Sequence, residues 1–168
     1  MKKLSILSLT LLLGACSTPY KSEGFAGGFS EIQLDKNVWQ VTFEGNGYTK
    51  SQRSEELAML RSAELTLSQN FTHFAFVDSR SSSETVTIST PQNSYSTFNA
   101  NTYGNSTYGT MSTRSYGGGT QSFNKPKTTN TVMMFNGKPT LNTLVYDAKL
   151  ICENIGKKYE VICNEVKK

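Results

Sequence analysis

The sequence predicts a small α+β domain whose elements follow in the order β-α-β-β-α, with two helices on one face of the sheet and a long low-complexity insertion. Runs with apolar residues at every second position alternate with stretches whose apolar residues recur at helical spacing. Between residues 91 and 127 both patterns stop, and Ser, Thr, Asn and Gly dominate. About 150 residues remain once an N-terminal export segment is set aside, which suits one domain.

The N-terminus has the layout of a secretory signal peptide, which we place at residues 1–15. Two lysines form a positive segment, and a short apolar run follows it. This run is too short to span a bilayer as a helix of about 20 residues. It ends in Leu13-Gly14-Ala15-Cys16, which resembles the lipobox of bacterial lipoproteins, so we expect cleavage between Ala15 and Cys16.

Cys16 is then the predicted lipidation site. Its sulfur would take a diacylglyceryl group, and the amine freed by cleavage would take a further acyl chain such as palmitate. At about 0.8 kcal/mol per buried methylene, several acyl chains hold a protein durably at a membrane. Ser17 follows in place of an aspartate, which in similar lipoproteins favours the periplasmic face of the outer membrane. The alternative is a plain signal peptide followed by a chance cysteine.

Residues 16–30 are small, polar and glycine-rich, and we expect a lipidated flexible tether there. The first part of the α+β domain should occupy residues 31–90. Within it, alternation predicts a strand over 38–43, with Trp39, Val41 and Phe43 on one face. Helical spacing of Leu57 and its apolar neighbours predicts a helix that Thr49 or Ser51 caps and that stops at Asn70, and this helix should pack on the sheet. A strand over 72–77 follows, and a second alternating stretch covers 85–90.

The remainder of the domain should occupy residues 128–168. The run 131–135 reads as a strand that ends at an Asn-Gly turn. Residues 142–155 carry an apolar stripe at helical spacing, so we expect the second helix there. A short edge strand over 159–163 would complete the sheet.

The insertion, residues 91–127, is predicted to be disordered. Arg114 is its one charged residue before Lys125, and aromatic residues recur through it in polar surroundings. Such a segment buries too little apolar surface to offset the entropy of ordering. A loop this long inside a compact domain is usually disordered or functional.

Charge and cysteine content narrow the possible partners. The net charge of +4 includes two lysines of the export segment, so the mature chain is weakly basic and we expect no nucleic-acid partner. With Cys16 lipidated, Cys152 and Cys163 remain, and an exported chain permits a disulfide between them. The alternative is two buried thiols. No metal is expected, because no histidine lies near these cysteines.

Several motifs together resemble a family of short, uncharacterised proteobacterial outer-membrane lipoproteins. The motifs are Gly28-Phe29-Ser30-Glu31, Val41-Thr42-Phe43-Glu44-Gly45-Asn46 and Leu60-Arg61-Ser62-Ala63-Glu64-Leu65-Thr66. The resemblance covers residues 24–77, and extends to 131–156 only by the order of elements. It implies an envelope lipoprotein with a small α+β domain, and it implies no reaction.

Arg61 and Glu64 form the main polar pair, because they lie one turn apart on the predicted helix. Glu64 falls beside the apolar stripe, so Arg61 or the backbone N–H groups of residues 45–47 should satisfy it; the competing interpretation is a carboxylate that acts as acid or base. The single histidine, His73, could act with a serine nucleophile, but the sequence contains no Gly-x-Ser-x-Gly motif. We therefore expect no catalytic residues, no enzyme activity, and no cofactor beyond the covalent lipid.

Regularly spaced tyrosines in the insertion form the one surface that suggests a partner. Tyr103, Tyr108 and Tyr116 can stack on sugar rings or bases, and such segments can also adhere to one another. The alternative is a disordered spacer whose aromatic residues have no partner. Three functions follow as hypotheses. The first is a non-catalytic, membrane-anchored structural or interaction module of the envelope. The others are an envelope-stress sensor or accessory subunit with a protein partner, and a cell-wall or glycan binder that uses these tyrosines.

Overall fold

The computed structural model describes residues 17–163, in two compact units. Unit 1 contains the chain up to Glu84 and from Asn124 onward, and unit 2 contains Thr85–Phe123. The predicted cleavage and lipidation sites, Ala15 and Cys16, lie outside the described residues.

Unit 1 is built on an antiparallel sheet with the strand order β1-β2-β4-β3-β5. β1 (Gly28–Asp35) and β2 (Val38–Glu44) form a hairpin in which Phe29 lies opposite Phe43. β2 then pairs with the inner end of β4 (Ser106–Phe135), which places Val41 opposite Asn130. β3 (His73–Tyr103) lies between β4 and the short β5 (Val145–Asp147).

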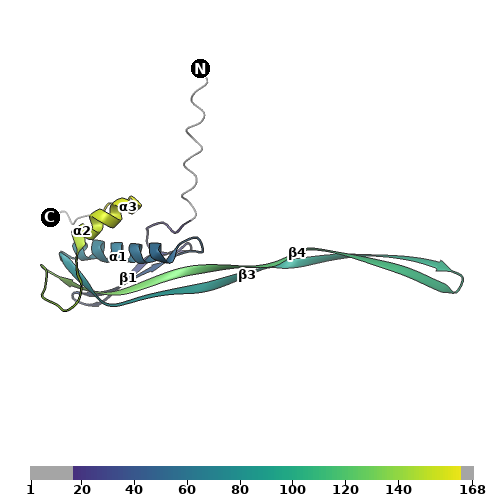
Figure 1. Ribbon diagram of the computed structural model, residues 1–168, viewed down its shortest axis with the longest axis horizontal. Coiled ribbons are helices and arrows are strands. Elements are labelled where there is room, and N and C mark those ends of the chain that lie inside the picture. The colour runs from purple at the N-terminus through teal and green to yellow at the C-terminus, as the bar shows by residue number, and fades with distance from the viewer. Residues whose placement is uncertain (1–16, 164–168) are drawn as a thin grey trace, which may run out of the picture. The chain divides into compact units, whose positions relative to one another are not determined.

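One long helix, α1 (Ser51–Ser68), lies along one face of this sheet (Figure 1). Its Leu57, Leu60 and Ala63 are completely buried, as the helical spacing predicts. They meet Val41 and Phe43 of β2, and burial of such side chains contributes about 1.5–3 kcal/mol each. The helix ends where Asn70 adopts a left-handed φ of 63°.

The C-terminal helical segment begins later than the sequence predicts. Residues 145–147 pair with β3 as β5, and the Asp147 side chain then accepts a hydrogen bond from Leu150 N at 3.0 Å. This cap starts α2 (Ala148–Ile151), which continues as a π-helical turn, η2 (Cys152–Gly156), and as α3 (Lys157–Tyr159). Glu160 follows with a left-handed φ of 56°, so the edge strand expected over 159–163 does not form.

The predicted fold class is therefore wrong. The order is β-β-α-β-β-β-α, and residues 17–163 are 56% strand and 20% helix, mostly antiparallel sheet rather than a β-α-β-β-α layer. Two strands that the sequence does not predict, β1 and β5, account for the difference in element order. β1 is not predicted as a strand: its first three residues fall in the expected tether, and its exposed edge position tolerates Ser, Glu, Gln and Asp, which weakens the apolar alternation. β5 has three residues, too few to show a period.

The flexible tether expected over residues 16–30 is also wrong for its described part. Thr18 is completely buried, and Gly28 already belongs to β1. Tyr20 packs on Phe29, with ring centroids 4.9 Å apart. Glycine in this segment serves tight packing rather than flexibility: Gly27 has a φ of 87°, and a Cβ there would collide with the carbonyl of Glu44.

Unit 2 is a two-stranded antiparallel ribbon, so the disorder predicted for residues 91–127 is the third correction. Its strands are the outer parts of β3 and β4, joined by a two-residue turn in which Gly104 has a φ of 60° (Figure 1). The ladder of backbone hydrogen bonds orders these residues without a core, and Thr and Tyr favour extended backbone. The number of apolar residues, on which the prediction of disorder rests, gives no information about such backbone hydrogen bonds.

Candidate functional site

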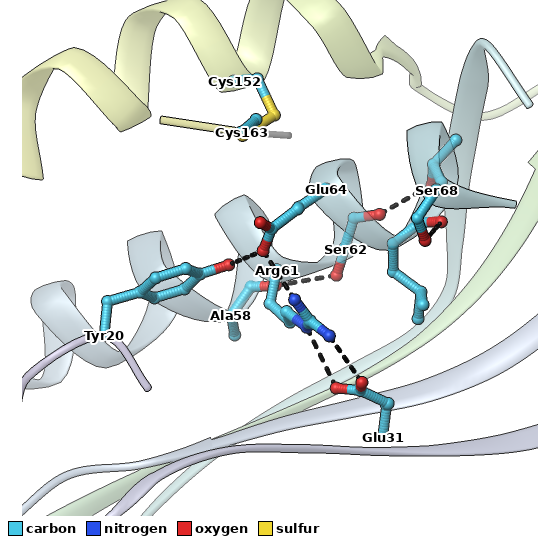
Figure 2. A network of polar contacts seen from close by, with 11 residues as sticks. Tyr20, Glu31, Ala58, Arg61, Ser62, Glu64, Ser68, Cys152 and Cys163 are labelled. Atoms are coloured by element: carbon cyan, nitrogen blue, oxygen red, sulfur yellow. Dashed lines mark hydrogen bonds and ion pairs between the residues drawn. A yellow bond between two sulfur atoms is a disulfide. The ribbon is translucent and has the colours of Figure 1, made fainter. Parts of the chain in front are cut away.

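A partly buried cluster of charges joins α1 to the N-terminal segment and to β1. Arg61 on α1 binds Glu31 of β1 in a bidentate pair, Nη2–Oε1 at 2.6 Å and Nε–Oε2 at 3.0 Å. Its Nη1 also donates to Glu64 Oε2 at 2.7 Å, the pairing that helical spacing predicts. Tyr20 OH donates to the same Glu64 oxygen at 2.8 Å (Figure 2). The Arg61 guanidinium also lies 4.1 Å from the Phe29 ring centroid.

The electrostatics of this cluster favour a structural role for Glu64. Burial lowers the pKa of Arg61, but the hydrogen bonds to Glu31 and Glu64 raise it by more than burial lowers it. The net shift of this pKa is therefore upward. Burial, and then the charge of Glu64, raise the pKa of Tyr20. One oxygen of Glu64 therefore accepts two hydrogen bonds from groups that hold their protons. The cluster ties the segment before β1 to α1, and the turn over residues 45–47 is not its partner.

A second polar centre forms around Thr18, close to the first described residue. The Thr18 hydroxyl donates to Ala26 O at 3.0 Å and accepts from Asn46 N at 2.7 Å and from Thr49 Oγ1 at 3.0 Å. The Thr18 amide in turn donates to Thr49 Oγ1 at 3.1 Å. One buried side chain thus holds two loops, 24–27 and 45–49, against the N-terminal end of the described chain.

Cys152 and Cys163 form a disulfide across the C-terminal segment, with their Cα atoms 6.0 Å apart. Figure 2 shows the bridge beside α1, in the same region as the Arg61 cluster. A polar contact also connects the C-terminal segment to α1. Glu56 Oε2 of α1 accepts hydrogen bonds from Lys158 Nζ and from Tyr159 OH, each at 2.5 Å. Together they fix the end of the described chain to α1.

The ribbon of unit 2 keeps one register along its length. Cross-strand hydrogen bonds of its side chains join Thr87 to Ser122, Thr90 to Gly119, Ser94 to Ser115, Ser96 to Thr113 and Thr102 to Thr107. In every pair the two residue numbers add to the same total, and this also holds for Ser79 with Asn130 and Ser81 with Thr128. A net insertion in either strand would change that total.

This register gathers the tyrosines on one face. Because side chains alternate along a strand and opposite residues share a face, Tyr95, Tyr103, Tyr108 and Tyr116 all lie on the same side of the outer ribbon. Tyr103 and Tyr108 are diagonal neighbours near the turn, and Tyr95 and Tyr116 repeat that relation eight residues along each strand, about 26 Å away. Arg114 lies opposite Tyr95. The four tyrosines are 60–78% exposed.

The opposite face of the ribbon differs in character. It carries the hydroxyl pairs Ser94–Ser115, Ser96–Thr113 and Thr102–Thr107, together with Phe98 and Met111. A Cβ on Gly109 would collide with the Phe98 ring, so this ring lies over Gly109. Sequence reasoning selected Tyr103, Tyr108 and Tyr116 but left out Tyr95. Counting outward from a Gly104-Asn105 turn would have placed all four on one face and Phe98 on the other.

Other groups that could carry chemistry are separate from these centres. His73 Nδ1 lies 2.9 Å from Thr72 Oγ1, and its Nε2 lies 4.0 Å from Asp147. Within residues 17–163, no group of three or more His, Cys, Asp or Glu side chains is placed to hold a metal ion. In the same part of the chain, no helix has both the length and the apolarity to cross a membrane.

No family model matches this chain, and no match was found among curated proteins or among solved structures. The resemblance to proteobacterial lipoproteins therefore stays a prediction.

Proposed function

We propose that this chain is a lipid-anchored, non-catalytic interaction module of the bacterial envelope, held at the periplasmic face of the outer membrane. The observation that carries the proposal is the tyrosine face of unit 2. Four exposed aromatic side chains lie on one side of a ribbon in which Arg114 is the one charged residue between Glu84 and Lys125. Exposed aromatic residues gathered on one surface are typical of contact sites.

The architecture of the ribbon supports the need for a partner. A two-stranded hairpin by itself is marginally stable in water, and both of its edges expose backbone groups. A partner that covers a face or an edge of unit 2 would remove tyrosine surface from water and reduce fluctuations of the ladder. In the Arg61 cluster, by contrast, the polar side chains are hydrogen-bonded to one another, and the cluster joins α1 to the sheet.

A glycan is the second candidate for the partner, and the polar residues of the tyrosine face favour it. Asn101 lies opposite Tyr108 and Asn93 lies opposite Tyr116, so each diagonal tyrosine pair has an amide beside it. Flat aromatic rings with neighbouring amides can stack on a sugar ring and hydrogen-bond to its hydroxyls. This face would then bind cell-wall glycan strands or lipopolysaccharide.

The anchor is tested by fractionation of cells that express the Cys16→Ala variant. We expect the wild-type chain in the outer-membrane fraction and the variant in the soluble periplasmic fraction. Recovery of the variant in the membrane fraction would contradict lipid anchoring through Cys16.

The tyrosine face is tested with a variant in which all four tyrosines become serine. The matched control changes Phe98 and Met111, on the opposite face of the same ribbon, to serine. We expect crosslinking in intact cells, or co-sedimentation with purified peptidoglycan, to be lost in the first variant and kept in the second. Equal retention of both interactions in the two variants would refute the role of this face.

A further inference from the structure

Two loops of unit 1 each present an aromatic side chain beside the start of the mature chain. Phe25 is fully exposed, at 110% of its reference area, on the turn Gly24–Gly27. Tyr48 is 67% exposed on the loop that follows β2. Large apolar surface that a folded domain holds out in this way often marks a contact with another surface.

Both loops are held in place rather than extended into solvent. The Phe25 turn is closed by Gly27 N donating to Gly24 O at 2.9 Å and by Gly24 N donating to Gly27 O at 3.2 Å. Tyr48 N donates to Asn46 Oδ1 at 3.0 Å. Each loop also binds the hydroxyl of the buried Thr18, so the two loops lie next to each other and their aromatic residues are neighbours at the surface.

The chain itself places the predicted lipid at this surface. Cys16 is two residues before Thr18, and two residues of extended chain reach at most about 7 Å. Thr18 is completely buried and hydrogen-bonded to both loops, so it cannot follow the lipid away from the domain without breaking that packing. Acyl chains on Cys16 would therefore enter the bilayer next to Phe25 and Tyr48.

We propose that this surface, which we call the docking face (Phe25, Tyr48 and the loops that carry them), lies directly on the lipid headgroup layer. Phe25 enters the boundary between headgroups and acyl chains, and the amphipathic ring of Tyr48 lies at headgroup level, where aromatic residues are favoured. The exposed charged residues near these loops in sequence have mixed charge: Lys21, Glu23 and Lys50. The aromatic side chains should therefore contribute more to membrane contact than charge does. The proposal rests on lipidation of Cys16, and it adds that the domain is seated on the membrane instead of standing away on a tether.

The test uses the full-length, acylated protein in phosphatidylcholine vesicles whose acyl chains carry bromine, a short-range quencher of tryptophan fluorescence. Phe25→Trp and Tyr48→Trp place a probe on the docking face. Leu34→Trp is the matched control, because Leu34 is an exposed residue of β1 about 20 Å along the strand from Gly28. Each signal is taken as the difference from the parent chain, which contains Trp39, and mass spectrometry verifies the lipid on every sample.

We expect several-fold stronger quenching of the probes at positions 25 and 48 than of the probe at position 34. Equally weak quenching at all three positions on verified lipoprotein would overturn the docking face and leave the anchor intact. A blue-shifted but unquenched probe at position 25, in protein that is dimeric in detergent, would overturn membrane docking in favour of a second copy of the chain. Absence of the lipid by mass spectrometry would refute the anchor, and the docking face with it.

Discussion

Replacing Thr18 by valine tests whether the chain next to the predicted lipid is part of the folded domain. Valine keeps the volume of threonine and removes the hydroxyl. Three hydrogen bonds are lost, to Ala26 O, Asn46 N and Thr49 Oγ1. At about 1 kcal/mol net for each bond, and with a buried acceptor left without its partner, the expected loss is about 2–4 kcal/mol of unfolding free energy. That is a large part of a typical stability of about 5–15 kcal/mol.

The assay is urea unfolding of a chain that begins at residue 16 and carries Cys16→Ser, so that no lipid is present. With a slope of about 1–3 kcal/mol per molar urea, the midpoint should fall by about 1–2 M with little change in slope. Hydrogen exchange should also accelerate at the Asn46 amide, which donates to Thr18. The matched control is Thr102→Val, since Thr102 is exposed on the ribbon and shares one hydroxyl contact, with Thr107. Its effect should stay within about 0.5 kcal/mol. Equal midpoints for the two variants would refute the view that Thr18 holds the two loops.

Three further predictions concern the charge cluster and the C-terminal segment. Arg61→Met should lower stability by about 2–3 kcal/mol in thermal unfolding, because it leaves two partly buried carboxylates without their cation; no change in melting temperature would contradict a structural role. The double variant Cys152→Ser, Cys163→Ser should lose about 2–3 kcal/mol, the chain-entropy value for a short loop, and an unchanged urea midpoint would argue against this stabilisation. Burial raises the pKa of Glu56, but hydrogen bonds from Lys158, Tyr159 and Gln52 outweigh it and hold this pKa below its usual range. A lowered folded-state pKa adds stability above the unfolded value and loses it as pH falls through the folded value. The contact of α3 with α1 should therefore weaken below about pH 4.5, and Glu56→Gln should remove this pH dependence from tyrosine chemical shifts.

Local periodicity explains which parts of the fold the sequence predicts correctly. The face shared by Trp39, Val41 and Phe43 and the buried stripe of α1 both follow from the spacing of apolar residues within one element. The Arg61–Glu64 contact has the same origin, since it needs only the helical rise. These features depend on a few neighbouring residues, so a single sequence contains the information they require.

The corrected features depend on partners that are distant in sequence. Thr18 is buried because residues 26, 46 and 49 bind it, and nothing in the sequence around Thr18 shows those contacts. Glu31 completes the Arg61 cluster across 30 residues. β1 and β5 exist through pairing with β2 and β3, and the ribbon exists through a ladder between two polar strands. Amino-acid composition indicates how much apolar surface a segment can bury. These elements are stabilised mainly by backbone pairing, so composition does not predict them.

Because the register of β3 and β4 is unbroken, the ribbon can become shorter or longer by paired changes in its two strands. Removing two residues from each strand at opposite positions would leave every remaining pair aligned and every remaining side chain on its original face. Each such step would shorten the ribbon by about 7 Å. The number of tyrosines on display, and the distance they span, can thus change through paired deletions or duplications between Asn93 and Tyr116, with no compensating substitution beneath α1.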